Sequence, residues 1–339
     1  MRTEFSAHIS VVIPCYRVTA HILGVIDSIG TEVDSIYVID DKCPDHSGDF
    51  VAAHCTDPRV KILRHEVNQG VGGAVMTGYR AALEDGADIM IKLDGDGQMD
   101  ATLIPGFVAP ILAGDADYTK GNRFFNLEKI GAMPKARLIG NSLLSFMTKL
   151  SSGYWDLFDP TNGYTAIHAS VARHLPFHKI STRYFFETDM LFRLNTLRAV
   201  VVDVPMDAKY GSEVSNLKIS RIIGEFSVKH CRNFLKRIFY NYYLRDLSLA
   251  SIELPLGIAL LIFGCVFGSY HVLSGNGTST PAGTVMVAAL PILIGCQLIL
   301  AFLGYDIASV PRRPLHVMQE RTAKNESKLK QSHQDGTST

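Results

Sequence analysis

The chain has 339 residues and equal numbers of basic and acidic side chains, 33 of each, so its formal net charge is zero. Charged residues make up 19% of the chain and apolar ones 47%, whereas soluble domains carry about 25% charged residues. This balance argues against a nucleic-acid-binding protein, which is normally basic overall or along one face. It also argues against a disordered chain. The composition suits a soluble portion joined to a membrane portion.

The six cysteines contain no CxxC pair, which argues against a secreted disulfide scaffold and against a zinc ribbon. We therefore expect free thiols. The first eight residues lack the apolar stretch of a secretory signal.

Short apolar runs alternate with helical patterns over the first two thirds of the chain. The runs that we predict to be strands are Ile9–Ile13, Ser35–Asp40, Val60–Leu63, Ile89–Leu93, Tyr118–Lys120 and Val200–Val204. Alternation of strands and helices predicts an α/β fold with a mainly parallel sheet that is covered on both faces. Such sheets bind ligands at the carboxyl ends of their strands.

An acidic cluster, Asp94-Gly-Asp-Gly-Gln98, directly follows the fourth predicted strand. In an extended chain, residues i and i+2 point the same way, so Asp94 and Asp96 can face one ligand. Two carboxylates on one side suit a hard divalent cation that also binds a diphosphate. The alternative is an ordinary solvated turn.

Three further features could bind parts of a nucleotide or a phosphate. Asp40 and Asp41 end the second strand, where they could accept hydrogen bonds from a nucleobase or a ribose, unless they belong to a solvated turn. Residues 68–73 precede a helix and resemble a phosphate-cradling loop, although they match neither GxGxxG nor Walker A. Arg123 and Arg137 follow the fifth strand, and arginine binds phosphate bidentately; lone surface arginines would merely be solvated.

The last third of the chain contains two long uncharged segments. Leu254–Leu273 has 20 residues and Ala282–Tyr305 has 24, with no Asp, Glu, Lys or Arg in either. At about 1.5 Å per helical residue, each is long enough to span the hydrocarbon core of a bilayer, which is roughly 30 Å thick. The alternative is a pair of buried helices in a soluble domain.

The flanks of these segments are basic, and the connecting loop Ser274–Pro281 is uncharged. By the positive-inside rule we expect an integral membrane protein with two transmembrane helices, whose N-terminal domain and both termini are cytoplasmic. Residues 1–215 would form the catalytic domain and 251–308 the membrane hairpin. Between them, 216–250 would be amphipathic helices, either lying in the membrane interface or packed on the catalytic domain. Residues 309–339 are expected to be a disordered tail.

Taken in order, these features resemble family 2 glycosyltransferases of the GT-A fold. The resemblance covers about residues 8–305 and is strongest to polyprenyl-phosphate hexosyltransferases, which include dolichol-phosphate mannose synthases and bactoprenol glucosyltransferases. The segments that carry it are Val12-Ile-Pro-Cys-Tyr16, Asp40-Asp41, Asn68–Gly72, Asp94-Gly-Asp-Gly-Gln98, Gly121–Phe124 and Arg137.

The resemblance implies a Rossmann-like GT-A domain followed by the membrane hairpin. It implies inverting transfer of a hexose from a nucleotide diphosphate sugar to a polyprenyl phosphate. Asp94, Asp96 and Gln98 would hold Mg²⁺ or Mn²⁺, with Asp96 essential for catalysis. Arg123 and Arg137 would grip the lipid phosphate. The residues implied to seat the nucleotide sugar are Pro14, Tyr16, Asp40, Asp41, Asn68, Gly70 and Asp94.

The sequence departs from the family pattern at several positions. Arg17 and Val18 stand where relatives often have Asn-Glu, Cys43 replaces a serine after the paired aspartates, and Asn141 stands where lipid-phosphate transferases often have a serine. The first of these departures, at Arg17 and Val18, bears on the base and ribose contacts of the loop after the first strand.

Two other functions stay open at this point. Phe186-Glu-Thr-Asp189 is similar to the Thr-Glu-Asp of processive polysaccharide synthases, so the acceptor could be a polysaccharide or a lipid-linked oligosaccharide. However, their Gln-x-x-Arg-Trp motif cannot occur, because Trp155 is the only tryptophan. A non-catalytic membrane scaffold is the other alternative. The sequence leaves open the roles of Glu187 and Asp189 and whether the chain forms a homo-oligomer.

Overall fold

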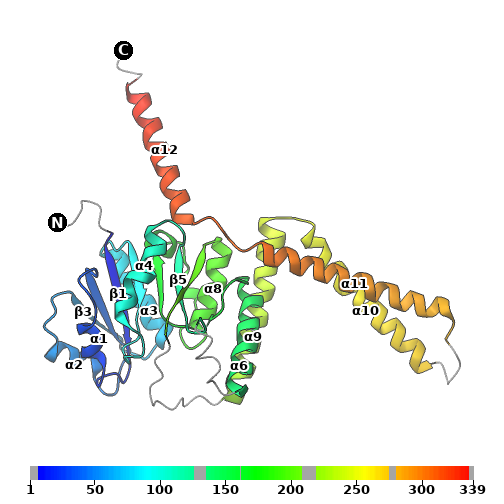
Figure 1. The fold of residues 1–339 in the computed structure, drawn as a ribbon, viewed down its shortest axis with the longest axis horizontal. Coiled ribbons are helices and arrows are strands. Elements are labelled where there is room, and N and C mark those ends of the chain that lie inside the picture. Colours follow the sequence, from blue (N-terminus) through cyan, green and yellow to red (C-terminus); the bar gives the residue numbers. More distant parts are fainter. Residues whose placement is uncertain (1–6, 126–134, 161, 208–218, 275–279, 336–339) are drawn as a thin grey trace. The chain divides into compact units, whose positions relative to one another are not determined.

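The computed structural model describes residues 7–125, 135–160, 162–207, 219–274 and 280–335 (Figure 1). The chain divides into two compact units. The first unit comprises residues 1–233 together with 311–339, and the second comprises 234–310.

A seven-stranded sheet forms the centre of the first unit. Along the sheet the order is β3 (Val60–Arg64), β2 (Ser35–Asp40), β1 (Ile9–Cys15), β4 (Ile89–Lys92), β6 (Thr165–His168), β5 (Tyr118–Asn122) and β7 (Val201–Pro205). β6 runs antiparallel to its two neighbours, while the other pairings are parallel. The mainly parallel sheet is thus confirmed. β6 was not predicted, because its sequence, Thr-Ala-Ile-His, is not a continuous apolar run, unlike the equally short β4.

Helices cover both faces of this sheet, as expected from the strand pattern. On one face, the alternate strand residues Val11 and Ile13 share a buried core with α1 (Ile22–Asp27) and α4 (Ile104–Leu112). On the other face, Val12 lies against Gly78 of α3 (Val71–Glu84). α8 (Phe186–Leu197) packs beside α3. The remaining helices of the first unit are α2 (Ser47–His54), η1 (Ala101–Leu103), α6 (Lys135–Ser152), α7 (Ala169–Ala172), η2 (Phe177–Lys179), α12 (Leu315–Asp335) and most of α9 (Ile219–Phe239).

The part of α9 in the first unit packs on that unit. The Phe226 ring meets the Phe185 ring edge-on at 5.3 Å. Asn233 donates a hydrogen bond to Asp189 at 3.0 Å. Of the two interpretations of residues 216–250, contact with the catalytic domain therefore describes this part of α9, and a place in the membrane interface stays a prediction.

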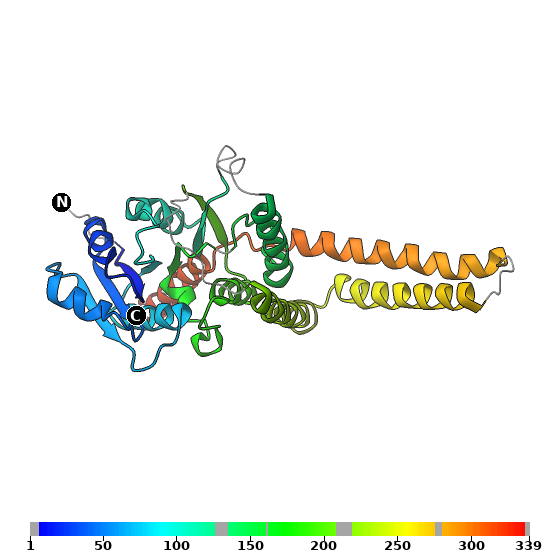
Figure 2. The ribbon, with the colours of Figure 1, turned by 90° about the horizontal axis from the view of Figure 1, so that it is seen from below.

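The second unit contains the end of α9, the π-helix η3 (Tyr240–Arg245), α10 (Ala250–Ser274) and α11 (Ala282–Ala308). α10 and α11 lie side by side as a hairpin (Figure 2). Both are long and apolar enough to cross a membrane, and only 22% and 11% of their most apolar windows are buried. This exposure disagrees with a buried helix pair in a soluble domain. Arg237 pairs with Asp306 of α11 at 2.6 Å, and both side chains are buried.

The end of the chain differs from the expected disordered tail. Leu315–Asp335 forms α12, and Asp117, which is fully buried, anchors its start. The Asp117 carboxylate accepts hydrogen bonds from the backbone N–H groups of Leu315 and His316 and from His316 Nδ1, the last at 2.7 Å. The polar sequence of this segment concealed the helix, whose start is also held by the His316 ring, stacked on the His168 ring at 4.4 Å.

We predict that His316→Ala loosens this anchor. Burial alone would raise the pKa of Asp117, but the hydrogen bonds from His316 and from backbone N–H groups outweigh burial and lower it. A hydrogen bond to a charged group contributes about 1.5–3 kcal/mol, so the free energy of unfolding of the variant should fall by about that amount. A carboxyl group whose pKa is lowered by folding stabilises the folded state at pH values above its ordinary pKa. This stabilisation is lost as the pH falls through the pKa of the folded state. The difference in unfolding free energy between the variant and the unaltered protein should therefore shrink in acid.

Denaturation in detergent and amide hydrogen exchange of α12 would measure this effect. Gln319→Ala, on the exposed surface of the same helix, is the control and should leave both readings unchanged. Equal stability and equal exchange in the His316 variant would show that Asp117 does not hold α12.

Candidate active site

Most of the predicted site residues that the structure describes lie on segments that start from one edge of the sheet. Parallel pairing brings Cys15 opposite Asp40, and β4 lies on the other side of β1. The segments that follow β1, β2 and β4 therefore lie at the same carboxyl edge. Since β6 is antiparallel, its beginning also lies at this edge, with Thr165 opposite Lys92. The segment before β6 was not among the predicted site residues.

Asp94 and Asp96 follow β4 in a turn in which Gly97 has a φ of 77°. Asp96 Oδ1 accepts a hydrogen bond from the backbone N–H of Gln98 at 2.9 Å, so Gln98 meets Asp96 through its main chain. Both carboxylates belong to partly exposed residues. Carboxylate oxygens are the ligands that Mg²⁺ prefers, commonly together with substrate phosphates. The donor set thus fits a divalent cation.

This pair alone does not complete a coordination sphere. Within the described residues, no group of three or more His, Cys, Asp or Glu side chains converges on a point that could hold a metal ion. Further ligands would have to come from elsewhere, and phosphate oxygens of a substrate would meet that need.

A buried lysine, which the sequence analysis did not single out, lies beneath the aspartate pair. Lys92 is 1% exposed, and its Nζ lies 2.8 Å from Asp94 Oδ1 and 3.8 Å from Glu187 Oε1. Burial would lower the pKa of Lys92, but Asp94 and Glu187 outweigh burial and raise it. A lysine inside the otherwise apolar run 89–93 was the available signal.

Asp40 and Asp41 both hold the backbone of neighbouring loops. Asp40 accepts from the N–H groups of Cys43 at 2.7 Å and Gly48 at 2.8 Å. Asp41 accepts from the N–H groups of Gln69 and Gly70, each at 2.7 Å. Both carboxylates are buried. The structure thus gives these residues a task in shaping the edge, and direct contact with a nucleoside stays a prediction.

The loop at 68–73, which resembled a phosphate cradle, is folded around Asp41. Asn68 donates to the Asp41 carbonyl at 2.9 Å, and His65 Nδ1 lies 2.7 Å from Asp41 Oδ1. Gly70 has a φ of 86°, and a Cβ there would lie 2.6 Å from the carbonyl oxygen of Thr182. Its N–H, like that of Gln69, points to Asp41, so these two groups do not form an open cradle.

The segment after β1 presents an exposed aromatic ring. Tyr16 is 47% exposed, and the Arg17 guanidinium lies 5.6 Å from the centre of its ring. Pro14 lies within β1, opposite Ile39. The Arg17 N–H donates to Cys43 Sγ at 3.0 Å, so Cys43, which replaces the family's serine, ties this segment to the loop after β2.

Arg123 forms a bidentate ion pair. Its Nε and Nη2 donate to the two carboxylate oxygens of Asp159 at 2.7 Å and 3.1 Å. The Asp159 side chain is 1% exposed and that of Arg123 33%. Asp159 was missed because it stands in a turn-like Asp-Pro-Thr-Asn segment. Arg137 belongs to the first turns of α6, and its side chain lies outside the described residues.

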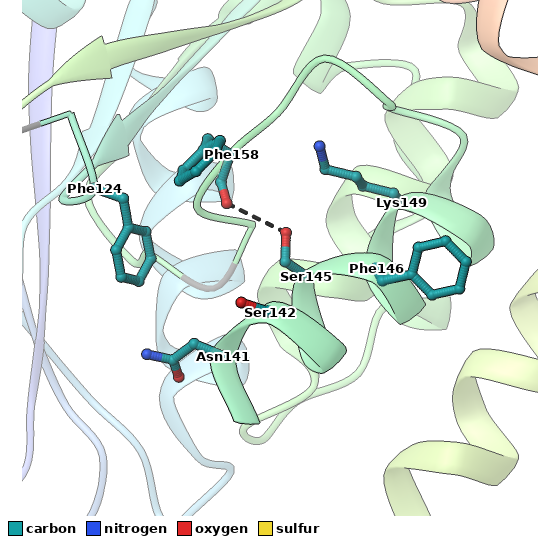
Figure 3. A pocket seen from close by; sticks show the side chains of 7 residues that line it. All are labelled: Phe124, Asn141, Ser142, Ser145, Phe146, Lys149 and Phe158. Atoms are coloured by element: carbon teal, nitrogen blue, oxygen red, sulfur yellow. Dashed lines mark hydrogen bonds between the residues drawn. The ribbon is translucent and has the colours of Figure 1, made fainter. Parts of the chain in front are cut away.

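A cavity of about 300 Å³ opens next to this ion pair, between α6 and the loop that contains Phe158 (Figure 3). The rings of Phe124 and Phe158 meet edge-on at 5.9 Å on one side of it. α6 contributes Asn141, Ser142, Ser145, Phe146 and Lys149 to the lining. The cavity combines apolar rings with polar side chains and a lysine.

Glu187 and Asp189, whose roles the sequence left open, have different surroundings. Asp189 is buried and accepts from the N–H of Ser181 at 2.8 Å and from Asn233 at 3.0 Å. Its contacts are structural. Glu187 instead faces Lys92 and lies close to the Asp94 side of the edge.

The mainly parallel sheet, with polar residues gathered at its carboxyl edge, defines an α/β domain of the kind that binds ligands at that edge, and comparisons with known proteins identify its family. The sequence profile of Glycosyl transferase family 2 matches residues 10–175. The UDP-N-acetylglucosamine–dolichyl-phosphate N-acetylglucosaminyltransferase of Methanococcus voltae is 28% identical over 216 residues, which cover 60% of this chain and 86% of that protein. The undecaprenyl-phosphate mannosyltransferase of Micrococcus luteus is 31% identical over 173 residues, which cover 50% and 70%.

Among solved structures, glucosyl-3-phosphoglycerate synthase from Mycobacterium tuberculosis shares the fold. Its TM-score is 0.50 at 20% identity, over 68% of this chain and 80% of that one. This likeness concerns the fold. On the family profile and the Micrococcus luteus relative, the chain belongs to glycosyltransferase family 2 and is a glycosyltransferase. The family, the GT-A type of fold and the enzyme class expected from the sequence are confirmed.

Proposed function

We propose that this enzyme transfers a hexose from a nucleotide diphosphate sugar to a polyprenyl phosphate, using Mg²⁺ or Mn²⁺. The observation that carries this proposal is the presence, in one chain, of a carboxylate pair at the sheet edge and two membrane-length helices. A polyprenyl acceptor lies in the bilayer with its phosphate at the interface, so an enzyme that uses it benefits from a membrane tether. The names of the two relatives above, which specify dolichyl and undecaprenyl phosphate, support the same acceptor class.

On the donor side, Asp96 and Asp94 would hold the cation, with Gln98 fixing Asp96. When bound, the cation neutralises charge that builds up on the departing diphosphate. The exposed Tyr16 ring and Pro14 offer a surface for the nucleoside. Asp40, Asp41, Asn68 and Gly70 would shape the loops around it.

On the acceptor side, Arg123 and Arg137 would bind the lipid phosphate, and the adjacent cavity would receive the first part of its apolar chain. A phosphate oxygen of the acceptor attacks the anomeric carbon while the bond from that carbon to the donor's diphosphate oxygen breaks. The electron pair leaves with the nucleoside diphosphate. Because the attacking oxygen is already anionic near neutral pH, no strong general base is needed. Direct displacement inverts the anomeric configuration.

One observation keeps a second acceptor class in view. A sugar hydroxyl, unlike a phosphate, needs a base to remove its proton, and Glu187 is a carboxylate at the edge of the site. A polysaccharide or lipid-linked oligosaccharide acceptor would use it. A lipid-soluble sugar phosphate that is labile in mild acid would identify the first class of product and exclude both this alternative and a non-catalytic scaffold.

The topology is tested by placing single cysteines in a cysteine-free variant. We expect Ser279→Cys, in the uncharged loop between the helices, to react with an impermeant thiol reagent on intact cells. Glu84→Cys, on the exposed surface of the first unit, should react only after lysis, because the basic flanks favour a cytoplasmic catalytic domain. The reverse labelling pattern would invert the proposed orientation.

Asp96→Asn should abolish transfer and leave the fold intact. The change removes one anionic ligand from a site that has two, which weakens the hold on the cation and diphosphate. Transfer of labelled sugar to polyprenyl phosphate, at saturating Mg²⁺ and Mn²⁺, measures the effect, and circular dichroism checks the fold. Near-normal turnover in this variant would contradict the metal assignment.

Arg123→Lys should weaken the lipid acceptor more than the donor. Lysine keeps a positive charge beside the buried Asp159 but loses the bidentate geometry. A charge-assisted hydrogen bond contributes about 1.5–3 kcal/mol, and about 1.4 kcal/mol is a tenfold change. The kcat/KM for polyprenyl phosphate should therefore fall roughly tenfold.

Arg123→Ala should lower stability as well, since it leaves Asp159 buried without this ion pair. Arg137→Ala should raise the acceptor KM by a similar factor. The donor Kd, measured without lipid, serves as the control and should change less than about twofold. A defect confined to the donor would place these arginines on the nucleotide instead.

A further inference from the structure

The ammonium group of Lys92 lies under the proposed donor site, beside the carboxylates of Asp94 and Glu187. In the sheet, Lys92 is opposite Val12 on one side and Thr165 on the other. Since Val12 lies against α3, Lys92 extends from the same face. α8, on this face, supplies Glu187. The Lys92 ammonium group therefore lies between the end of β4 and the start of α8, 2.8 Å from Asp94 Oδ1 and 3.8 Å from Glu187 Oε1.

A buried lysine in a strand usually lowers the stability of the fold, so its presence points to a role other than packing. Removing an ammonium from water costs more than an ion pair commonly returns, and apolar replacements of buried ion pairs are often neutral or stabilising. An apolar residue at position 92 would continue the pattern of Ile89, Met90 and Ile91. The lysine is thus better explained by what it holds than by packing.

The opposite wall of this site makes room for the lysine. A Cβ on Gly163 would lie 2.4 Å from Lys92 Nζ and 3.3 Å from Asp94 Oδ2. Any side chain there would push the ammonium away from Asp94. The start of β6 and the end of β4 thus fit together around the Lys92–Asp94 pair.

We propose that Lys92 is a positioning residue for the donor site, which fixes the carboxylates of Asp94 and Glu187 beside the bound nucleotide diphosphate. This inference rests on the proposed function. Lys92 keeps Asp94 in one orientation, because the ion pair engages Oδ1. It also offsets the repulsion between two carboxylates that approach the same point. Without the Lys92 ammonium group, the Asp94 carboxylate would turn away or would hold the divalent metal ion in the wrong place.

The test is a binding experiment that does not depend on turnover. Isothermal titration of the full-length protein with UDP or GDP, whichever the unaltered protein binds, is performed in MnCl₂. We expect Lys92→Met to weaken nucleotide binding at least tenfold, or about 1.4 kcal/mol. Lys61→Met is the matched control, because Lys61 forms an exposed ion pair with Asp85 at 2.6 Å; its nucleotide Kd should stay within twofold.

A second pair of variants separates positioning from folding. In an Asp94→Asn background, Lys92→Met should change the nucleotide Kd by a smaller factor than it does in the unaltered protein, because the lysine then acts through Glu187 alone. Gly163→Ala keeps both charged groups but displaces the ammonium, and it should weaken nucleotide binding even if Lys92→Met fails to fold.

The inference is overturned if Lys92→Met lowers only the melting temperature, or if Gly163→Ala and Lys92→Met bind the nucleotide as the unaltered protein does. Equal effects of Lys92→Met with and without Asp94→Asn would also overturn it. If the unaltered protein binds neither nucleotide with Mn²⁺, the proposed function itself fails, and this inference fails with it.

Discussion

Buried carboxylates that gather backbone N–H groups hold the loops of this enzyme in place. A carboxylate removed from water must recover its hydration through hydrogen bonds or ion pairs. Asp40 does so with Cys43 and Gly48, and Asp41 does so with Gln69 and Gly70. Each of these carboxylates fixes the conformation of a loop, because moving the loop would leave a buried charge without hydrogen bonds. The carboxyl edge of the sheet is therefore arranged before any ligand arrives.

The same chemistry separates structural acids from acids that are suited to a ligand. Asp159 and Asp189 are buried and bonded to protein groups, whereas Asp94 and Asp96 are partly exposed at the end of a strand. Glu187 lies between these classes, since it is mostly buried and faces a lysine. Only acids of the partly exposed kind, Asp94 and Asp96, are open to a bound cation. Preorganised polar groups of this sort act without further rearrangement when charge develops.

Much of this was predictable from the sequence, for reasons that the structure makes clear. The β-branched runs predicted β1, β2 and β4, because buried parallel strands are continuously apolar. The aspartates after them were found because they break that pattern. β6 was missed, since its four residues, Thr165–His168, do not form a continuous apolar run. α12 was not predicted, because its sequence is polar and shows no apolar periodicity.

The hydrogen-bond and ion-pair partners of the site residues could not be predicted from the sequence. Nothing in the local pattern pairs Arg123 with Asp159, which lies 36 residues away, or Asp41 with the loop at 68–70. These contacts depend on which chain segments the sheet order brings together. Lys92 was visible as a charged residue in an apolar strand, but its partner Glu187 lies on a different element. The contacts by which residues far apart in the sequence pair their buried charges are thus visible only in the three-dimensional structure.

The anchor of α12 at Asp117 has a consequence for how the protein is made. Residues 311–339 belong to the same compact unit as residues 1–233, so the apolar hairpin is a domain insertion within the catalytic unit. On the ribosome, the segment that satisfies Asp117 emerges only after both apolar helices have been synthesised. The catalytic unit thus reaches its final fold after the hairpin is available for membrane insertion. A soluble fragment would need residue 233 joined to 311 by a linker, rather than simple removal of the C-terminal third.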